Sequence, residues 1–178
     1  MNQDLGDGIR LRPLREGDAS ALAEAYSRNR THLEPWDPKR ADEYFTAARQ
    51  ESLVAYTLGE MGAGRSSALV LTDDHERIVG RVNLSDIVRG AFESSHLGYW
   101  LDARLTGHGI MRRAVSAAIA HARTDLGLHR IQAATLVHNT ASQRVLAATG
   151  FAQIGLAERY LHIAGEWRDH LLFQRLLE

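Results

Sequence analysis

The chain has 178 residues, of which 44% are hydrophobic and 24% charged, with a formal net charge of −1 and no cysteine. Residues 1–178 fit a single domain that is large enough to bury a core. The near-zero charge argues against a nucleic-acid partner, because phosphate recognition requires a basic surface. The absence of cysteine excludes disulfides and an acyl-cysteine intermediate. No basic, apolar leader and no membrane-length apolar run occur, so we expect a cytoplasmic protein without membrane association.

The first half of the chain alternates between strand and helix patterns. We predict a strand at residues 9–14, a helix at 18–30 and a second helix at 40–58. Between the helices, two prolines enclose Trp36 and Asp37 and break the pattern. Residues 67–71 and 77–84 follow a glycine-containing loop and form a predicted hairpin around the acidic turn at 73–76.

A glycine-containing turn joins the aromatic strand predicted at residues 96–101 to a helix. The turn reads Arg104-Leu-Thr-Gly107-His-Gly109. The helix has an apolar stripe at helical spacing: Ile110, Met111, Ala114, Val115, Ala118, Ile119 and Ala122. Glycines allow close backbone approach, and a helix start attracts anions, so the turn predicts a pyrophosphate site. A dinucleotide fingerprint needs a third glycine where Arg112 stands, and no Walker lysine occurs; a turn without a ligand is the alternative.

The last third of the chain predicts strand, helix, strand, strand. A strand at 130–137 precedes a short helix, for which Thr140 and Gln143 form a candidate capping box and Asn139 is an alternative cap. Gly150 suits a left-handed helix end. Strands at 150–156 and 170–176 follow, with a loop centred on 164–166. The order of elements predicts an α/β fold with a mixed, mostly antiparallel central sheet and helices on both faces.

Two motifs in this order resemble the acyl-CoA signatures of the GCN5-related N-acetyltransferases (GNAT family). They are Arg104-x-x-Gly107-x-Gly109 and Asn139-x-x-Ser142-x-x-Val145-Leu146-x-x-x-Gly150-Phe151. Three further segments, His32-Leu-x-Pro-Trp36, Gly98-Tyr-Trp-Leu-Asp102 and Gly165-Glu-Trp-x-Asp169, resemble the RimJ/RimL-type branch. That branch acetylates the N-terminal α-amine of ribosomal proteins.

The resemblance implies the acyl-CoA N-acyltransferase fold and an acetyl-CoA-dependent N-acetyltransferase. We expect acetyl-CoA as co-substrate and a primary amine as acceptor, above all a ribosomal-protein N-terminus, attacked directly in a ternary complex. A small-molecule or antibiotic amine acetyltransferase and a non-catalytic acyl-CoA-binding regulator are the alternatives. A homodimer is common in such families, and the sequence leaves the oligomeric state open.

The resemblance also implies the site residues. Those expected to bind acetyl-CoA are Tyr99, Trp100, Leu101, Arg104, Gly107, His108, Gly109, Ile110, Met111, Asn139 and Ser142. Ser142 would also protonate the leaving thiolate; a plain helix-surface serine is the alternative. The branch often has a glutamate at the position of His96, so His96 is the candidate base, with Glu93 and His138 as others.

Three residue groups remain ambiguous at this point. The nine histidines show no metal-ligand spacing, so we expect no metal site. Arg112 and Arg113 fit either the CoA 3′-phosphate or a solvated helix face. Trp36 fits either a cap on the acceptor cleft or a staple between the helices and the sheet.

Overall fold

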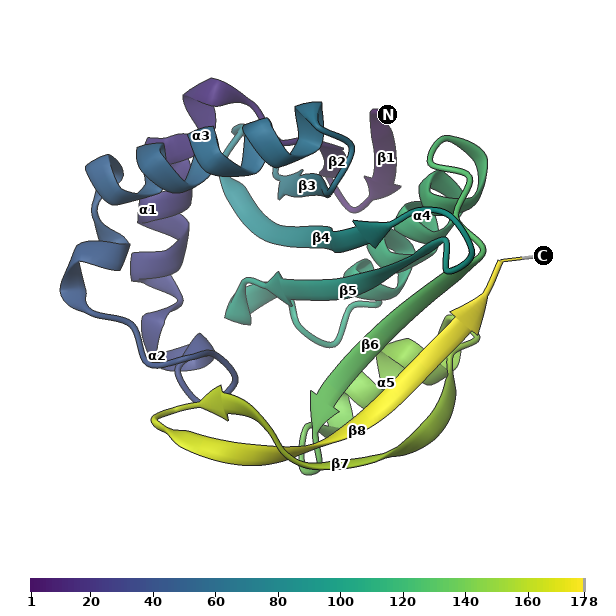
Figure 1. The fold of residues 1–178 in the computed structure, drawn as a ribbon. Coiled ribbons are helices and arrows are strands. Elements are labelled where there is room, and N and C mark those ends of the chain that lie inside the picture. Colours follow the sequence, from purple (N-terminus) through teal and green to yellow (C-terminus); the bar gives the residue numbers. More distant parts are fainter. Residues whose placement is uncertain (178) are drawn as a thin grey trace.

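A computed structural model describes residues 1–177 of the chain. Eight strands form one sheet in the order β1-β2-β3-β4-β5-β6-β8-β7, in which only the β5–β6 pair is parallel (Figure 1). The strands are β1 (Gln3–Gly6), β2 (Ile9–Pro13), β3 (Ser67–Thr72), β4 (Ile78–Val88), β5 (Ser94–Leu101), β6 (Arg130–Leu136), β7 (Ala152–Ile163) and β8 (Glu166–Leu176). The prediction of a mixed, mostly antiparallel sheet is therefore confirmed.

Helices cover both faces of the sheet, as the sequence predicts (Figure 1). They are α1 (Ala19–Arg28), α2 (Arg30–Leu33), α3 (Ala47–Gly62), α4 (Ile110–Thr124) and α5 (Thr140–Ala148). One buried cluster joins the sheet to α4 and α5 through residues such as Leu84, Ile110 and Leu146. A second cluster joins the opposite face to α1 and α3 through Leu22, Val54 and Val70. Burial of these two apolar faces supplies the main driving force for this three-layer arrangement.

The structure differs from the sequence prediction in the N-terminal part. The sequence did not predict β1. The first helix ends at Arg28, two residues before the predicted end, because the buried Asn29 side chain donates back to the Ala25 carbonyl. The second helix was predicted from residue 40, but α3 begins only at Ala47. Thr46 is extended and its hydroxyl accepts from the Arg49 amide, so Thr46 is the helix cap and a 3-10 turn precedes it.

The start of α5 also differs in detail. Asn139 is the cap, since its Oδ1 accepts from the Ser142 amide at 3.1 Å. The Thr140–Gln143 capping box does not form, because Gln143 donates to the carbonyls of Leu136 and Val137 instead. Gly150 has a φ of 78°, which confirms the predicted left-handed helix end.

A chain of polar side chains fastens α4 to β3. Ser67 Oγ lies 3.1 Å from His121 Nε2, and His121 Nδ1 lies 2.7 Å from Asp125 Oδ2. The order of groups is that of a nucleophilic triad. Ser67 is only 6% exposed, however, so its hydroxyl is closed to a substrate and the chain is structural.

Candidate active site

Strands β5 and β6 separate in the middle of the sheet. Their parallel pairing covers only three residue pairs and ends at His96 and Gln132, although β5 continues to Leu101 and β6 to Leu136. Residues 97–101 pair with β4 on one edge and with no described strand on the other. The diverging ribbons are visible in Figure 1. Free backbone N–H and C=O groups along this edge can pair with an extended, amide-containing ligand.

The glycine-containing turn lies at the open end of this gap. Gly107 and Gly109 have φ values of 84° and 72°, a left-handed conformation that strains residues with a Cβ. Gly109 is the cap of α4, so the amides of Ile110 and Met111 belong to the helix's first turn, whose N–H groups lack intrahelical partners. The turn therefore combines free N–H donors with a helix dipole, which is the arrangement that binds phosphate anions.

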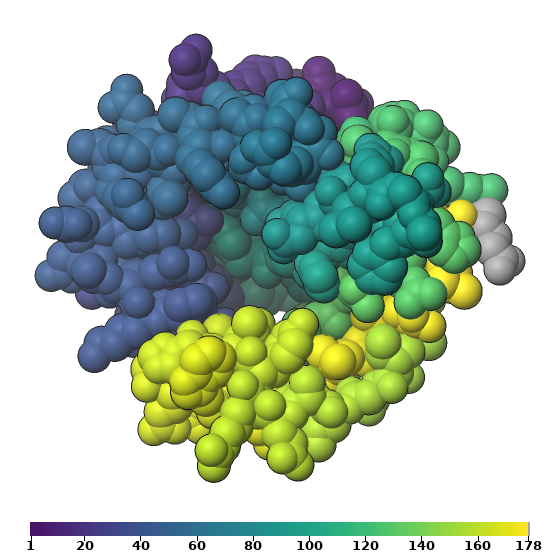
Figure 2. All heavy atoms as spheres, viewed as in Figure 1, coloured from purple at the N-terminus to yellow at the C-terminus, as the bar shows by residue number. Residues whose placement is uncertain are grey.

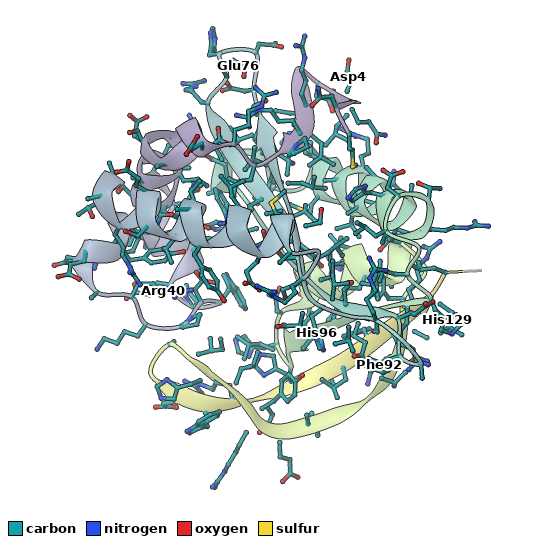
Figure 3. All side chains as sticks on the ribbon, turned by 45° about the horizontal axis from the view of Figure 1, so that its top comes forward. Asp4, Arg40, Glu76, Phe92, His96 and His129 are labelled. Atoms are coloured by element: carbon teal, nitrogen blue, oxygen red, sulfur yellow. The ribbon has the colours of Figure 1, made fainter. Side chains whose placement is uncertain are left out.

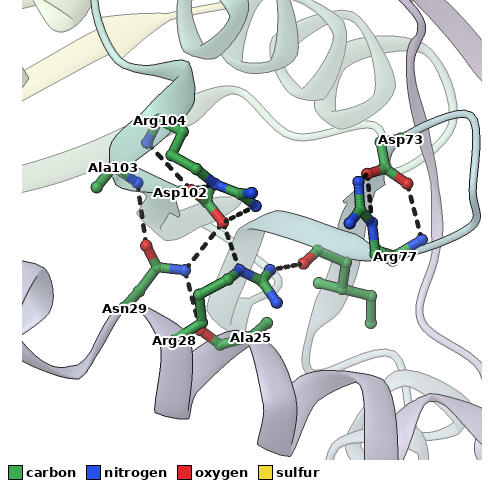
Figure 4. A network of polar contacts seen from close by, with 9 residues as sticks. Ala25, Arg28, Asn29, Asp73, Arg77, Asp102, Ala103 and Arg104 are labelled. Atoms are coloured by element: carbon green, nitrogen blue, oxygen red, sulfur yellow. Dashed lines mark hydrogen bonds and ion pairs between the residues drawn. The ribbon is translucent and has the colours of Figure 1, made fainter.

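A buried carboxylate holds this turn in place (Figure 4). Asp102 is 1% exposed in its side chain and accepts hydrogen bonds from the Arg28 guanidinium, the Asn29 amide and both backbone and side chain of Arg104. Burial raises the pKa of Asp102, but the hydrogen bonds from Arg104, Arg28 and Asn29 outweigh it and hold this pKa well below its ordinary value. Arg104 therefore shapes the turn through Asp102.

The two arginines of the first α4 turn have different environments. Arg113 pairs with Asp7 and donates to the His108 carbonyl, so its charge is already engaged. Arg112 is exposed and forms no ion pair with any residue of the described part. Of the two, Arg112 is the one available to a phosphate.

Ser142 and Tyr99 meet on the α4–α5 side of the gap. Tyr99 Oη lies 2.7 Å from Ser142 Oγ and 3.2 Å from the Ser142 carbonyl oxygen. Burial raises the pKa of Tyr99 to about 12, and the hydrogen bond to Ser142 acts in the opposite direction. Because Oδ1 of Asn139 caps α5, its Nδ2 is the group left to donate to a ligand amide.

His96 lies on the other face of the sheet. Alternation along β5 places His96 and Gly98 on the side of Trp100, which packs against the α1–α3 cluster. His96 is 47% exposed in its side chain, and its Nδ1 is 3.9 Å from Asp86 Oδ2. A Cβ built on Gly98 would meet nothing within 4 Å, so there is open space beside His96.

Glu93 is further from the gap than His96. It precedes β5, and its carbonyl accepts from the amides of His129 and Arg130 at the closed end of the β5–β6 pair. Three strand residues span about 10 Å, so Glu93 lies about that far beyond His96. In Figure 3, Phe92, the neighbour of Glu93, lies farther from the centre of the molecule than His96.

The segment around Trp36 bridges two sides of the cleft. The Trp36 ring lies 5.5 Å from the His138 ring, beside Asn139, and the Asp37 carbonyl accepts from the Ala164 amide in the β7–β8 turn. A cavity of about 240 Å³ lies behind this segment, lined in part by Tyr26. Figure 2 shows the surface hollowed between the blue helical segment, the teal β4–β5 turn and the yellow-green hairpin. The segment thus borders the cleft and ties it to the sheet.

Sequence reasoning missed two side-chain contacts beside the gap. The contact of Tyr99 Oη with Ser142 and the approach of Asp86 to His96 both join residues on different elements. Asp86 sits in a bulge of β4 with a φ of 51°. No short-range sequence pattern predicts that bulge, whereas the aromatic residues of β5 do predict the strand itself.

The described residues contain no group of three or more side chains that could hold a metal, and none of their helices is long and apolar enough to cross a membrane.

Comparison with known proteins adds independent information. Residues 9–152 match the Acetyltransferase (GNAT) domain. The chain is 35% identical over 167 residues to the ribosomal protein uS5-alanine N-acetyltransferase of Escherichia coli (strain K12), covering 93% of this chain and 86% of that protein. The structure of a ribosomal-protein-S5-alanine acetyltransferase from Vibrio fischeri superposes with a TM-score of 0.96 at 35% identity, covering 100% of this chain and 97% of that one. RimJ of Mycobacterium smegmatis in complex with CoA-disulfide gives 0.89 at 34% identity, covering 94% and 81%.

Proposed function

The chain belongs to the GNAT acetyltransferase family and is an acetyl-CoA-dependent N-acetyltransferase of the RimJ/RimL type, and from this premise we propose that its acceptor is a protein N-terminal α-amine. The observation that carries the proposal is the gap between β5 and β6, with His96 on the Trp100 face of β5 and Ser142 against Tyr99 on the other face. A ribosomal-protein N-terminus is the proposed acceptor, because the relative with 35% identity over 93% of the chain acts on uS5.

Acetyl-CoA would lie along the free edge of β5. The backbone of residues 99–101 (Tyr99, Trp100 and Leu101) would pair with the pantetheine amides, and Asn139 Nδ2 would donate to one of them. The amides of residues 107–111 (Gly107, His108, Gly109, Ile110 and Met111) would hold the pyrophosphate, with Arg104 shaping the turn. These assignments are supported by the positive φ of both glycines and by the open edge of the strand.

The proposed reaction is a direct attack within a ternary complex. The chain has no cysteine, so no enzyme thioester can form. His96, with Asp86 beside it, would accept the proton of the acceptor ammonium on one face of the sheet. Ser142 would donate its proton towards the thioester sulfur on the other face. With base and acid on opposite faces of the sheet, each would serve a different substituent of the tetrahedral intermediate, the nitrogen or the sulfur.

An α-amine suits this site better than a lysine side chain. The ordinary pKa of an α-amine is about 7.7–8.0 and that of lysine about 10.4. At neutral pH roughly 10–20% of α-amines are neutral, against well under 0.1% of lysine side chains. Less proton removal is needed for an α-amine, so a site with one exposed histidine as proton acceptor favours it over a lysine side chain.

An acceptor panel tests the proposal. Thiol release from acetyl-CoA would be followed with N-terminal peptides that begin with alanine or serine, with free amino acids and with polyamines. The enzyme adds no thiol background, because it lacks cysteine. The matched control is the same peptide with a blocked N-terminus and an internal lysine. Turnover of the free peptide alone supports the proposal, and turnover of the blocked peptide or of small amines alone refutes it.

Two substitutions test the proposed roles. Ser142→Ala should lower kcat about tenfold and leave the acetyl-CoA Kd nearly unchanged, because a thiolate is already a fair leaving group. His96→Gln should lower kcat/KM for the acceptor amine and leave the acetyl-CoA Kd nearly unchanged, because only the proposed proton acceptor is lost. An unchanged kcat/KM in His96→Gln would assign the base elsewhere, with Glu93 as the next candidate.

Two further proposals concern the setting. We propose a homodimer through β7, which is an edge strand with Ile154, Leu156 and Leu161 exposed. Light scattering would show a mass of twice the chain, and Leu156→Lys would reduce the measured mass to that of a single chain.

We also propose a cytoplasmic location, where ribosomal proteins are available; fractionation of cells would test it.

A further inference from the structure

Tyr99 links β5 to α5 across the open part of the gap. Its Oη lies 2.7 Å from Ser142 Oγ, although the two residues are 43 positions apart in the chain. Among residues 1–177, this side chain makes the hydrogen-bonded connection between positions 97–101 and α5. The contact therefore belongs to the part of the sheet where no backbone ladder fixes the spacing.

The direction of this hydrogen bond decides what Ser142 can do. A serine hydroxyl has one proton and two acceptor lone pairs. If Ser142 donates to Tyr99, no serine proton is left for a ligand. If Tyr99 donates to Oγ, Ser142 keeps its proton, and its O–H becomes a stronger donor because hydrogen bonds in a chain polarise one another. The single phenol proton can reach Oγ at 2.7 Å or the Ser142 carbonyl oxygen at 3.2 Å, and the shorter contact favours Oγ. Burial raises the pKa of Tyr99 to about 12, so the phenol keeps its proton at neutral pH.

Building on the proposed role of Ser142, we propose that Tyr99 is a positioning residue whose hydroxyl donates to Ser142 Oγ and aims the serine proton at the thioester sulfur. During transfer, the C–N bond forms, the C–S bond breaks, and the sulfur keeps the electron pair. The Ser142 hydroxyl stabilises that charge by a hydrogen bond. The nitrogen loses two protons, one as the ammonium and one as the attacking amine; one of them protonates the thiolate and the other passes to solvent, so the products are amide, thiol and one proton.

A double-mutant cycle tests this role. Tyr99→Phe, Ser142→Ala and the double variant would be compared for kcat, for KM of acetyl-CoA and for Tm. Tyr99→Phe keeps the ring and its packing, so we expect kcat to fall about tenfold while KM stays within about twofold. The double variant should be no slower than Ser142→Ala, because without the serine hydroxyl Tyr99 has nothing to orient.

Tyr26→Phe provides the matched control. Tyr26 is buried, and its hydroxyl accepts from Trp100 Nε1 at 3.2 Å on the opposite face of β5. Any loss it causes should multiply with that of Ser142→Ala. The proposal is overturned if Tyr99→Phe also multiplies with Ser142→Ala, if it leaves kcat unchanged, or if it chiefly raises KM and lowers Tm, which a spacer role would do.

The choice of acceptor keeps the two proposals separate. The cycle would be run with whichever amine of the panel turns over fastest. Turnover of small amines alone would refute the N-terminal acceptor and still measure the coupling between Tyr99 and Ser142. An unchanged kcat in Ser142→Ala would overturn the role of Tyr99 without bearing on the acceptor.

Discussion

Asp102→Asn would test whether a buried carboxylate holds the phosphate-binding turn. The Asp102 side chain is 1% exposed and joins α1, the end of β5 and the turn (Figure 4). Its Oδ2 accepts from Arg28 Nε at 2.8 Å and from Asn29 Nδ2 at 3.2 Å, while its Oδ1 accepts from Arg104. An asparagine has one acceptor oxygen, so its amide N–H₂ must face some of these donors.

The expected loss follows from the exposure of each partner. A hydrogen bond from a charged group contributes about 1.5–3 kcal/mol, and Arg28 is 30% exposed, so about 1.5–2 kcal/mol applies. Asn29 is buried and keeps its bond to the Ala25 carbonyl, so one orphaned N–H adds about 1 kcal/mol. Arg104 is 60% exposed, so solvent screens its ion pair and it is left out of the sum. The free energy of unfolding should fall by about 3 kcal/mol.

Urea unfolding monitored by circular dichroism measures this loss, which corresponds to a drop in Tm of roughly 6–12 °C for a chain of this size. The KM for acetyl-CoA should also rise, because the turn loses its anchor. Asp73→Asn is the control: the Asp73–Arg77 pair of the β3–β4 turn has a half-exposed arginine, so its loss should be below about 1 kcal/mol. Equal losses in both variants, or a loss below about 1 kcal/mol for Asp102→Asn, would refute the reasoning.

The pH dependence gives a second check on Asp102. Its pKa is lowered in the folded protein, so its stabilisation is present above the unfolded pKa of about 3.9 and disappears as the pH falls through the folded value. The difference in unfolding free energy between wild type and Asp102→Asn should therefore be full at pH 7 and shrink below about pH 4. A difference that grows on acidification would contradict this assignment.

Two further substitutions address the ligand sites. Gly109→Ala places a Cβ at a φ of 72° and should raise the KM for acetyl-CoA at least severalfold. The reason is that strain of about 1–2 kcal/mol displaces the amides that face the pyrophosphate. Gly17→Ala is the control and should leave this KM unchanged, because Gly17 has open space around it and no positive φ. Trp36→Ala removes the contact with the His138 ring and should raise the acceptor KM more than that of acetyl-CoA, as initial-rate kinetics would show. Trp167→Ala is the control, because Trp167 is 62% exposed. If Trp36→Ala and Trp167→Ala change the acceptor KM equally, Trp36 has no specific role at the cleft.

The sequence alone determined the local parts of the site. Gly107 and Gly109 adopt the left-handed conformation for which glycine is suited, and the apolar stripe from Ile110 onwards forms α4 and packs on the sheet. Gly150 ends α5 as predicted. These features depend on backbone sterics and on the helical period within a few residues, which is information that a short window of sequence contains.

The tertiary structure decided how these parts meet. The β5–β6 pairing stops at His96 and Gln132. Tyr99 contacts Ser142, and Asp37 contacts Ala164. Local secondary-structure propensity predicts none of these three features. Each contact joins segments that are at least 36 residues apart in the chain. Such contacts form because the buried faces of several helices and strands must be covered together, so they depend on the whole packing rather than on local preference.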